Sequence, residues 1–292
     1  MRANNLKWIY LIVLSLIWGS SFILIKKGLV GLTPIQLGAI RVIFTGIFLL
    51  IVGFNKIKSI KSEDWKWVTL TGFLGTFFPA FLFAFAETEI DSSIASILNS
   101  LVPLNTIILG AFVFKIGSTK RQVLGVLIGL LGAILLIMNG ASVNTNQNYL
   151  YVSFVIIATF MYATSVNILK RNLQEMNALT IAVGNFAVII IPAFIILLFS
   201  DFFNLEYLST SEVKVSLLYM VLLSLFGTAI AKVLFNKLVH VATPVFASSV
   251  TYLMPVIAVF WGVLDGESFS FIQGVASAII LLGVYLSHKR KS

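Results

Sequence analysis

Two cationic side chains, Arg41 and Lys232, lie inside long apolar stretches of this sequence. Ionisable residues are costly within a bilayer and are usually functional when they occur there. Either side chain could hold the carboxylate or phosphate of a substrate. Two structural alternatives stand beside this interpretation. Lys232 could extend to the lipid headgroups, and Arg41 could form an ion pair or bind backbone carbonyls.

Small and polar residues form a stripe with helical spacing in each of two further apolar stretches. On a membrane helix, such a face contacts protein or a cavity rather than lipid. The pattern predicts a cavity wall, with close helix packing as the alternative. The first stripe is Ser92, Ser96, Asn99, Pro103, Thr106 and Gly110, and the second is Pro244, Ser248, Thr251, Pro255, Ala258 and Gly262.

Pro103 and Pro255 lie in the middle of these two stretches. Proline lacks a backbone N–H and weakens a helix, and interrupted helices in transporters expose backbone groups to substrate. Either proline could instead produce a kink with no ligand role. The aromatic rings of Trp18, Tyr162 and Tyr252 also lie near mid-stretch. They could stack on a planar or apolar substrate, or pack between helices.

The sequence limits the remaining chemistry. It has no cysteine, which excludes disulfides and thiolate metal sites. It has no Ser-His-Asp set, no phosphate-binding glycine loop and no metal-ligand cluster, so we expect no catalytic residue, no cofactor and no metal. No carboxylate lies clearly within an apolar stretch, and Glu87, at the edge of one, is the nearest candidate for proton coupling. This favours facilitated diffusion or exchange over tight proton coupling.

The elements that carry these residues must be membrane helices. Of the 292 residues, 59% are hydrophobic and 11% are charged, and a soluble domain of this size could not bury so much apolar surface. A membrane span needs roughly 20 apolar residues, so the chain has room for about ten spans. We expect them at residues 7–25, 34–54, 67–86, 92–114, 123–138, 149–169, 178–199, 213–236, 244–264 and 269–287.

The two halves of the sequence resemble each other. Each match alone is weak, because apolar helices resemble one another by chance, but the matches occur in the same order in both halves. Residues 18–22 correspond to residues 162–166, residues 74–76 to residues 226–228, and residues 93–103 to residues 245–255.

The loop charges are reversed between the halves. Lysine and arginine gather in the loops on one side of the predicted spans and most acids in the loops on the other, which orients a membrane protein. The net charge of +9 therefore indicates orientation rather than binding to nucleic acid. Five spans per half invert the second copy. We predict an all-α membrane protein of ten transmembrane helices in two inverted five-helix repeats, residues 1–140 and 149–288, with both termini cytoplasmic.

Several motifs resemble the EamA-type members of the drug/metabolite transporter superfamily: Trp18-Gly19-Ser20-Ser21-Phe22 with Lys26, then Pro34 and Arg41, then Pro255 with Gly266-Glu267. The resemblance covers essentially the whole chain. It implies a central cavity lined by helices 1, 3, 4, 6, 8 and 9, and export or exchange of amino acids, metabolites or drugs. The chain departs from the family pattern at Lys115, where the first half would carry the counterpart of Glu267.

We therefore expect a multi-pass carrier of the inner membrane that moves small metabolites by alternating access. Its partners would be a small-molecule substrate and lipid; a passive pore, or less readily a membrane-embedded enzyme, is the alternative. Glycines at residues 125–132 could join helices within a monomer or between two copies, so monomer and homodimer stay open. The expected substrate-binding residues are Trp18, Ser21, Asn99, Pro103, Tyr162, Thr228, Lys232, Tyr252 and Pro255, with Arg41 and Glu87 in an electrostatic or coupling role.

Overall fold

The computed structural model describes residues 3–90, 92–138, 149–264 and 271–287, and every regular element within these ranges is helical. Many large hydrophobic side chains are exposed on its outer surface, as faces that contact lipid require. Three shorter apolar helices occupy Val102–Phe114, Pro244–Ile257 and Gly274–Ser287. Six helical stretches are long and apolar enough to cross a membrane: Asn5–Gly28, Pro34–Ser59, Ser62–Ala86, Val152–Asn172, Ala178–Leu198 and Ser211–Val241.

Each predicted span falls on helical segments over its described residues. The first half contains α1 (Ala3–Gly19), α2 (Ser21–Gly28), α3 (Pro34–Gly53), α4 (Trp65–Gly72), the π-helical turn η3 (Phe73–Phe77), α5 (Phe78–Ala86), α6 (Ser92–Asn99), α7 (Val102–Leu109), the π-helical turn η4 (Gly110–Phe114) and α8 (Lys120–Met138). The second half contains α9 (Val152–Asn172), α10 (Ala178–Leu198), α11 (Leu205–Ser209), α12 (Ser211–Leu222), the π-helical turn η6 (Leu223–Ile230), α13 (Ala231–Val241), α14 (Pro244–Ser248), α15 (Val250–Leu264) and α16 (Phe271–Ser287).

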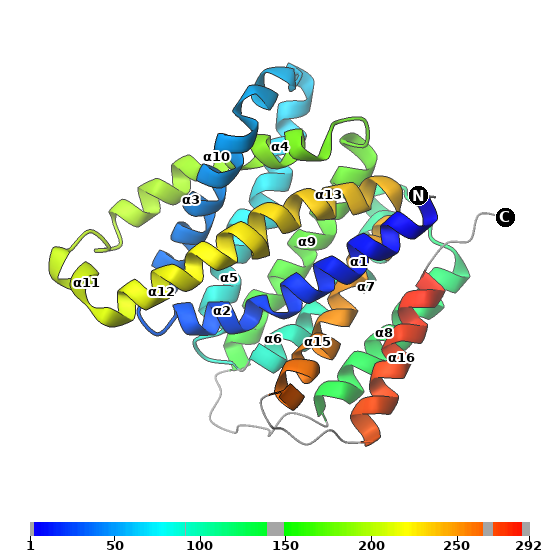
Figure 1. Ribbon diagram of the computed structural model, residues 1–292. Helices are drawn as coiled ribbons and strands as arrows, with labels where there is room; N and C mark the ends of the chain where they lie inside the picture. The colour runs from blue at the N-terminus through cyan, green and yellow to red at the C-terminus, as the bar shows by residue number, and fades with distance from the viewer. Residues whose placement is uncertain (1–2, 91, 139–148, 265–270, 288–292) are drawn as a thin grey trace.

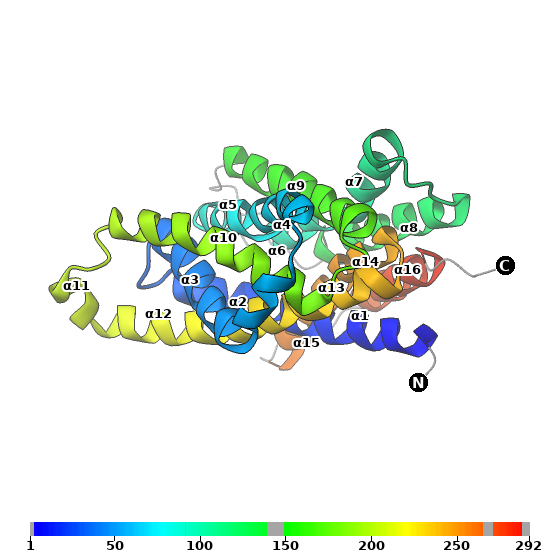
Figure 2. The same ribbon diagram turned by 90° about the horizontal axis from the view of Figure 1, so that it is seen from above.

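Helices from the two halves are interleaved rather than separated (Figure 1). The continuous line of α1 and α2 runs beside the long line of α12 and α13. Helix α3 packs against α10, where a methyl group on Gly46 would lie 2.7 Å from Ile190 Cδ1. Helix α8 packs against α16 at the opposite end of the molecule (Figure 2).

The α8–α16 contact depends on glycines. A Cβ on Gly283 would lie 2.5 Å from Gly129 Cα, and one on Gly125 would lie 2.7 Å from the Gly283 carbonyl oxygen. Such distances are too short for any larger residue, so the two backbones touch directly. The glycines of residues 125–132 therefore join two helices of one chain.

The prolines act differently from the predicted mid-span interruptions. Pro103 stands in the first turn of α7, after a break at Ser100 and Leu101. Proline suits a first turn, since the missing N–H would have no partner within the helix there. Pro255 lies inside α15, and the break in that stretch falls earlier, at Ser249.

Candidate functional site

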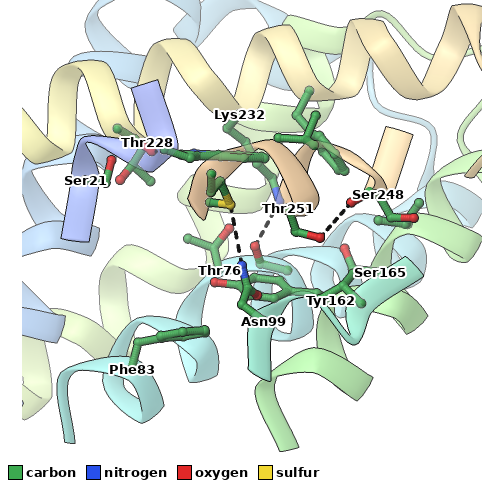
Figure 3. A pocket seen from close by; sticks show the side chains of 18 of the residues that line it. Ser21, Thr76, Phe83, Asn99, Tyr162, Ser165, Thr228, Lys232, Ser248 and Thr251 are labelled. Atoms are coloured by element: carbon green, nitrogen blue, oxygen red, sulfur yellow. Dashed lines mark hydrogen bonds between the residues drawn. The ribbon is translucent and has the colours of Figure 1, made fainter. Parts of the chain in front are cut away.

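A cavity of about 130 Å³ lies among helices from both halves of the chain (Figure 3). One water molecule needs about 10–15 Å³ of such space, so the cavity has room for a small organic molecule. All six predicted spans that the family resemblance implied contribute to its lining, and α3 adds Arg41.

The structure brings most of the predicted substrate-binding residues to this cavity. Figure 3 places Thr228 and Lys232 on one side, with Asn99, Tyr162 and Phe83 on the other. The lining includes Trp18, Ser21, Asn99, Tyr162, Thr228 and Lys232, together with Arg41.

Four predicted residues are not part of the lining. The hydroxyl of Tyr252 donates to the Val126 carbonyl oxygen over 2.9 Å, so the side chain is directed to α8. Pro103 and Pro255 are buried within α7 and α15. Glu87 follows the last turn of α5 and interacts electrostatically with Arg41 from outside the lining. Any role of these four residues in transport stays a prediction.

Both cations at the cavity are bonded to neutral acceptors. Arg41 Nε donates to Thr228 Oγ1 over 2.9 Å, and Lys232 Nζ donates to the Gly75 carbonyl oxygen over 3.3 Å. Lys232 is 7% exposed, so its ammonium is buried inside the protein against the Gly75 carbonyl oxygen. Buried charges are costly without partners, and the two cations therefore favour negative charge in the cavity.

Two π-helical turns present glycine carbonyls beside the cavity. In η6, the Ala231 N–H bonds to the Phe226 carbonyl oxygen, five residues earlier, and the Gly227 carbonyl oxygen accepts from Trp18 Nε1 over 2.9 Å. In η3, the Gly75 carbonyl oxygen accepts from Lys232, as described above. π-Helical turns redirect helical hydrogen bonds and are frequent at functional sites.

The same two glycines allow close contacts with serines. A Cβ on Gly75 would overlap Ser165 Oγ and lie 2.9 Å from Lys232 Nζ. A Cβ on Gly227 would lie 2.8 Å from Ser21 Oγ. Gly75 corresponds to Gly227 in the sequence repeat and Ser21 to Ser165. Each contact therefore pairs a glycine of one half with a serine of the other half.

The opposite wall combines aromatic rings with polar groups that lack partners. The rings of Phe83 and Tyr162 lie with their centroids 6.1 Å apart. Asn99 Nδ2 contacts Met254 Sδ at 3.6 Å, while the buried Asn99 Oδ1 and Thr76 Oγ1 have no hydrogen-bond partner among the described residues. Polar atoms in this state are available to a ligand.

Several residues that line the cavity were not among the expected substrate-binding residues. Ser165 and Thr76 are the repeat counterparts of Ser21 and Thr228, so the repeat itself could have identified them. Ser248 and Thr251 belong to the predicted polar stripe and do line the cavity. The aromatic residues Phe22, Phe83 and Phe235 carried no signal, because phenylalanine is common throughout the chain.

The chain is similar to known proteins over nearly its whole length. The chain is 27% identical to the inner membrane transporter YedA of Escherichia coli strain K12, over 94% of this chain and 88% of that protein. It is 23% identical to a probable amino-acid metabolite efflux pump of Salmonella typhimurium, over 93% of this chain and 91% of that protein. A crystal structure at 17% identity shares the fold with a TM-score of 0.72, covering 95% of this chain and 94% of that one.

The model of the EamA-like transporter family matches the chain twice, over residues 6–138 and residues 149–288. Together the two matches cover nearly all of the described structure. The chain therefore belongs to the EamA-like transporter family.

Proposed function

We propose that this protein is a secondary transporter that moves small metabolites, such as amino acids or related compounds, across the inner membrane by alternating access. The observation that carries the proposal is the shared cavity, because helices of both halves line it. Motion of one half against the other would open such a cavity to each side in turn. Lys232 and Arg41 would bind an anionic group of the substrate.

The proposal includes ten membrane helices in two inverted repeats. The double match of the family model supports this architecture, as do two pairs of counterpart helices that pack together, α3 with α10 and α8 with α16. The start of α1 and the end of α16 lie toward the same end of the molecule, which fits an even number of crossings (Figures 1 and 2). The loop charges favour cytoplasmic termini.

The proposed location and direction follow the relatives. One is named an inner membrane transporter and another a probable amino-acid metabolite efflux pump. We therefore propose an inner-membrane location and physiological export, or exchange of one metabolite for another.

Counterflow in proteoliposomes tests transport directly. Vesicles loaded with one unlabelled metabolite from a panel are diluted into a trace of the same labelled compound. A carrier accumulates the label transiently and saturates, whereas a passive pore shows neither behaviour. Absence of saturable counterflow across the panel would reject the proposal.

A matched pair of variants links transport to the cavity. Lys232→Met keeps side-chain length and removes the buried ammonium, and we expect loss of counterflow. Lys237→Met removes an exposed lysine from the same helix, α13, and should leave counterflow unchanged. Equal activity of the two variants would contradict the assignment of Lys232.

A further inference from the structure

The charges around the cavity are unbalanced. Its described lining contains two cations, Arg41 and Lys232, and no carboxylate. Glu87 acts on Arg41 through space from outside the lining, which leaves Lys232 as the cation with the least compensation. One negative charge inside the cavity would complete the site.

The uncharged polar groups also suit an anion. Tyr162 lines the cavity, and its hydroxyl can donate to an anion. Thr76 can donate as well, because its buried hydroxyl has no partner within the described part of the chain. A carboxylate accepts several hydrogen bonds at once, and bonds to an ionised acceptor are the stronger ones.

The ammonium group of a substrate would have no charged partner in the described lining. The carbonyl oxygens of Gly75 and Gly227 already accept from Lys232 and Trp18. Asn99 Oδ1 and Thr76 Oγ1 are buried acceptors without a partner among the described residues, and both are uncharged. An amino acid would bring its ammonium into a cavity that already holds two cations, and the described lining has no carboxylate to pair with that ammonium.

Aromatic rings form a large part of the remaining lining. The Trp18 and Phe235 rings lie 5.3 Å apart, and Phe83 and Tyr162 face the same space. Surfaces of this kind bind a flat or apolar body by stacking and burial. The ligand that matches the whole cavity is an apolar body with one acidic group.

We propose that the cavity selects organic anions, in which a carboxylate is attached to an aromatic or apolar body without an ammonium group, over the corresponding zwitterionic amino acids. This inference rests on the proposed transport function and narrows its substrate class.

Three probes isolate the charged groups on one body: 3-phenylpropanoate, phenylalanine and 2-phenylethylamine. Binding to the purified full chain is followed by thermal stabilisation, since the protonated acid can cross lipid unaided and would confuse flux. We expect 3-phenylpropanoate to bind at least about tenfold more tightly than phenylalanine, with the amine weakest, because the like charges repel. Equal or tighter binding of phenylalanine would overturn the proposal, and so would binding of none of the three.

Variants connect the preference to its source. Lys232→Met should abolish the preference for the anion, Lys232→Arg should retain it, and Lys237→Met should match the unsubstituted chain. If Lys232→Met does not fold, the test rests on Lys232→Arg, and a lost preference for the anion in that variant would count against the proposal. Counterflow of phenylalanine without binding of 3-phenylpropanoate would refute this inference and leave the transport proposal standing. Failure of counterflow across the whole metabolite panel would instead remove the transport proposal.

Discussion

Arg41 on α3 donates from Nε to Thr228 Oγ1 over 2.9 Å, so a cation of the first half is held by a hydroxyl in the π-helical turn of the second. Thr228 Oγ1 also donates to the Leu223 carbonyl oxygen over 3.2 Å. One threonine hydroxyl therefore connects the arginine to the backbone of η6.

Removing the Thr228 hydroxyl should lower the stability of the folded protein. Thr228→Val keeps the shape and leaves a guanidinium N–H without its acceptor, which we expect to lower the free energy of unfolding by about 1–3 kcal/mol. Thr228→Ser keeps the acceptor and is the control. The measurement is thermal unfolding in one detergent, and equal stability of the two variants would refute the role of the bond.

The contact between Gly75 and Ser165 predicts a rescue experiment. Gly75→Ala places a methyl group against Ser165 Oγ and Lys232 Nζ, and overpacking of this kind costs about 1–3 kcal/mol. Ser165→Ala in the same chain should restore part of the loss. The matching pair, Gly227→Ala with Ser21→Ala, should behave likewise. If the stability changes of the two single substitutions simply added in the double variant, the glycine and the serine of that pair would not interact.

The α8–α16 contact predicts a strong effect at Gly283. In Gly283→Ala the methyl group meets the backbone of Gly129, which cannot rotate away. We expect destabilisation of about 1–3 kcal/mol or more. Gly117→Ala is the matched control, because nothing lies within 4 Å of a Cβ there. Similar melting temperatures for both variants would contradict the close packing of the two helices.

The proposed orientation can be tested with introduced thiols, because the chain has no cysteine of its own. Ser59 and Ser209 are both exposed, and each hydroxyl donates to a carbonyl oxygen three residues earlier. In intact cells a membrane-impermeant maleimide should label Ser209→Cys, while Ser59→Cys should react only after permeabilisation. The reverse pattern would place the termini outside.

Much of the architecture could be read from local sequence patterns. Apolar length predicted helices at the positions where the structure has them, and the two polar stripes predicted Asn99, Ser248 and Thr251 beside a cavity. Both signals are local, because the bilayer selects apolar segments and a helix repeats its faces every 3.6 residues. Lys232 was identified for a similar reason, since a charge within an apolar stretch needs a function or a partner.

Only the tertiary structure decided which neighbour each side chain meets. Tyr252 follows Thr251 in the sequence, yet it is bonded to α8 while Thr251 lines the cavity, because one step along a helix turns a side chain by about 100°. Gly75 gains its importance from Ser165 and Lys232, which are far away in the chain. The sequence thus determined the helices and the family. The packing of those helices decided which polar groups stayed without partners, and with them the charge that the cavity favours.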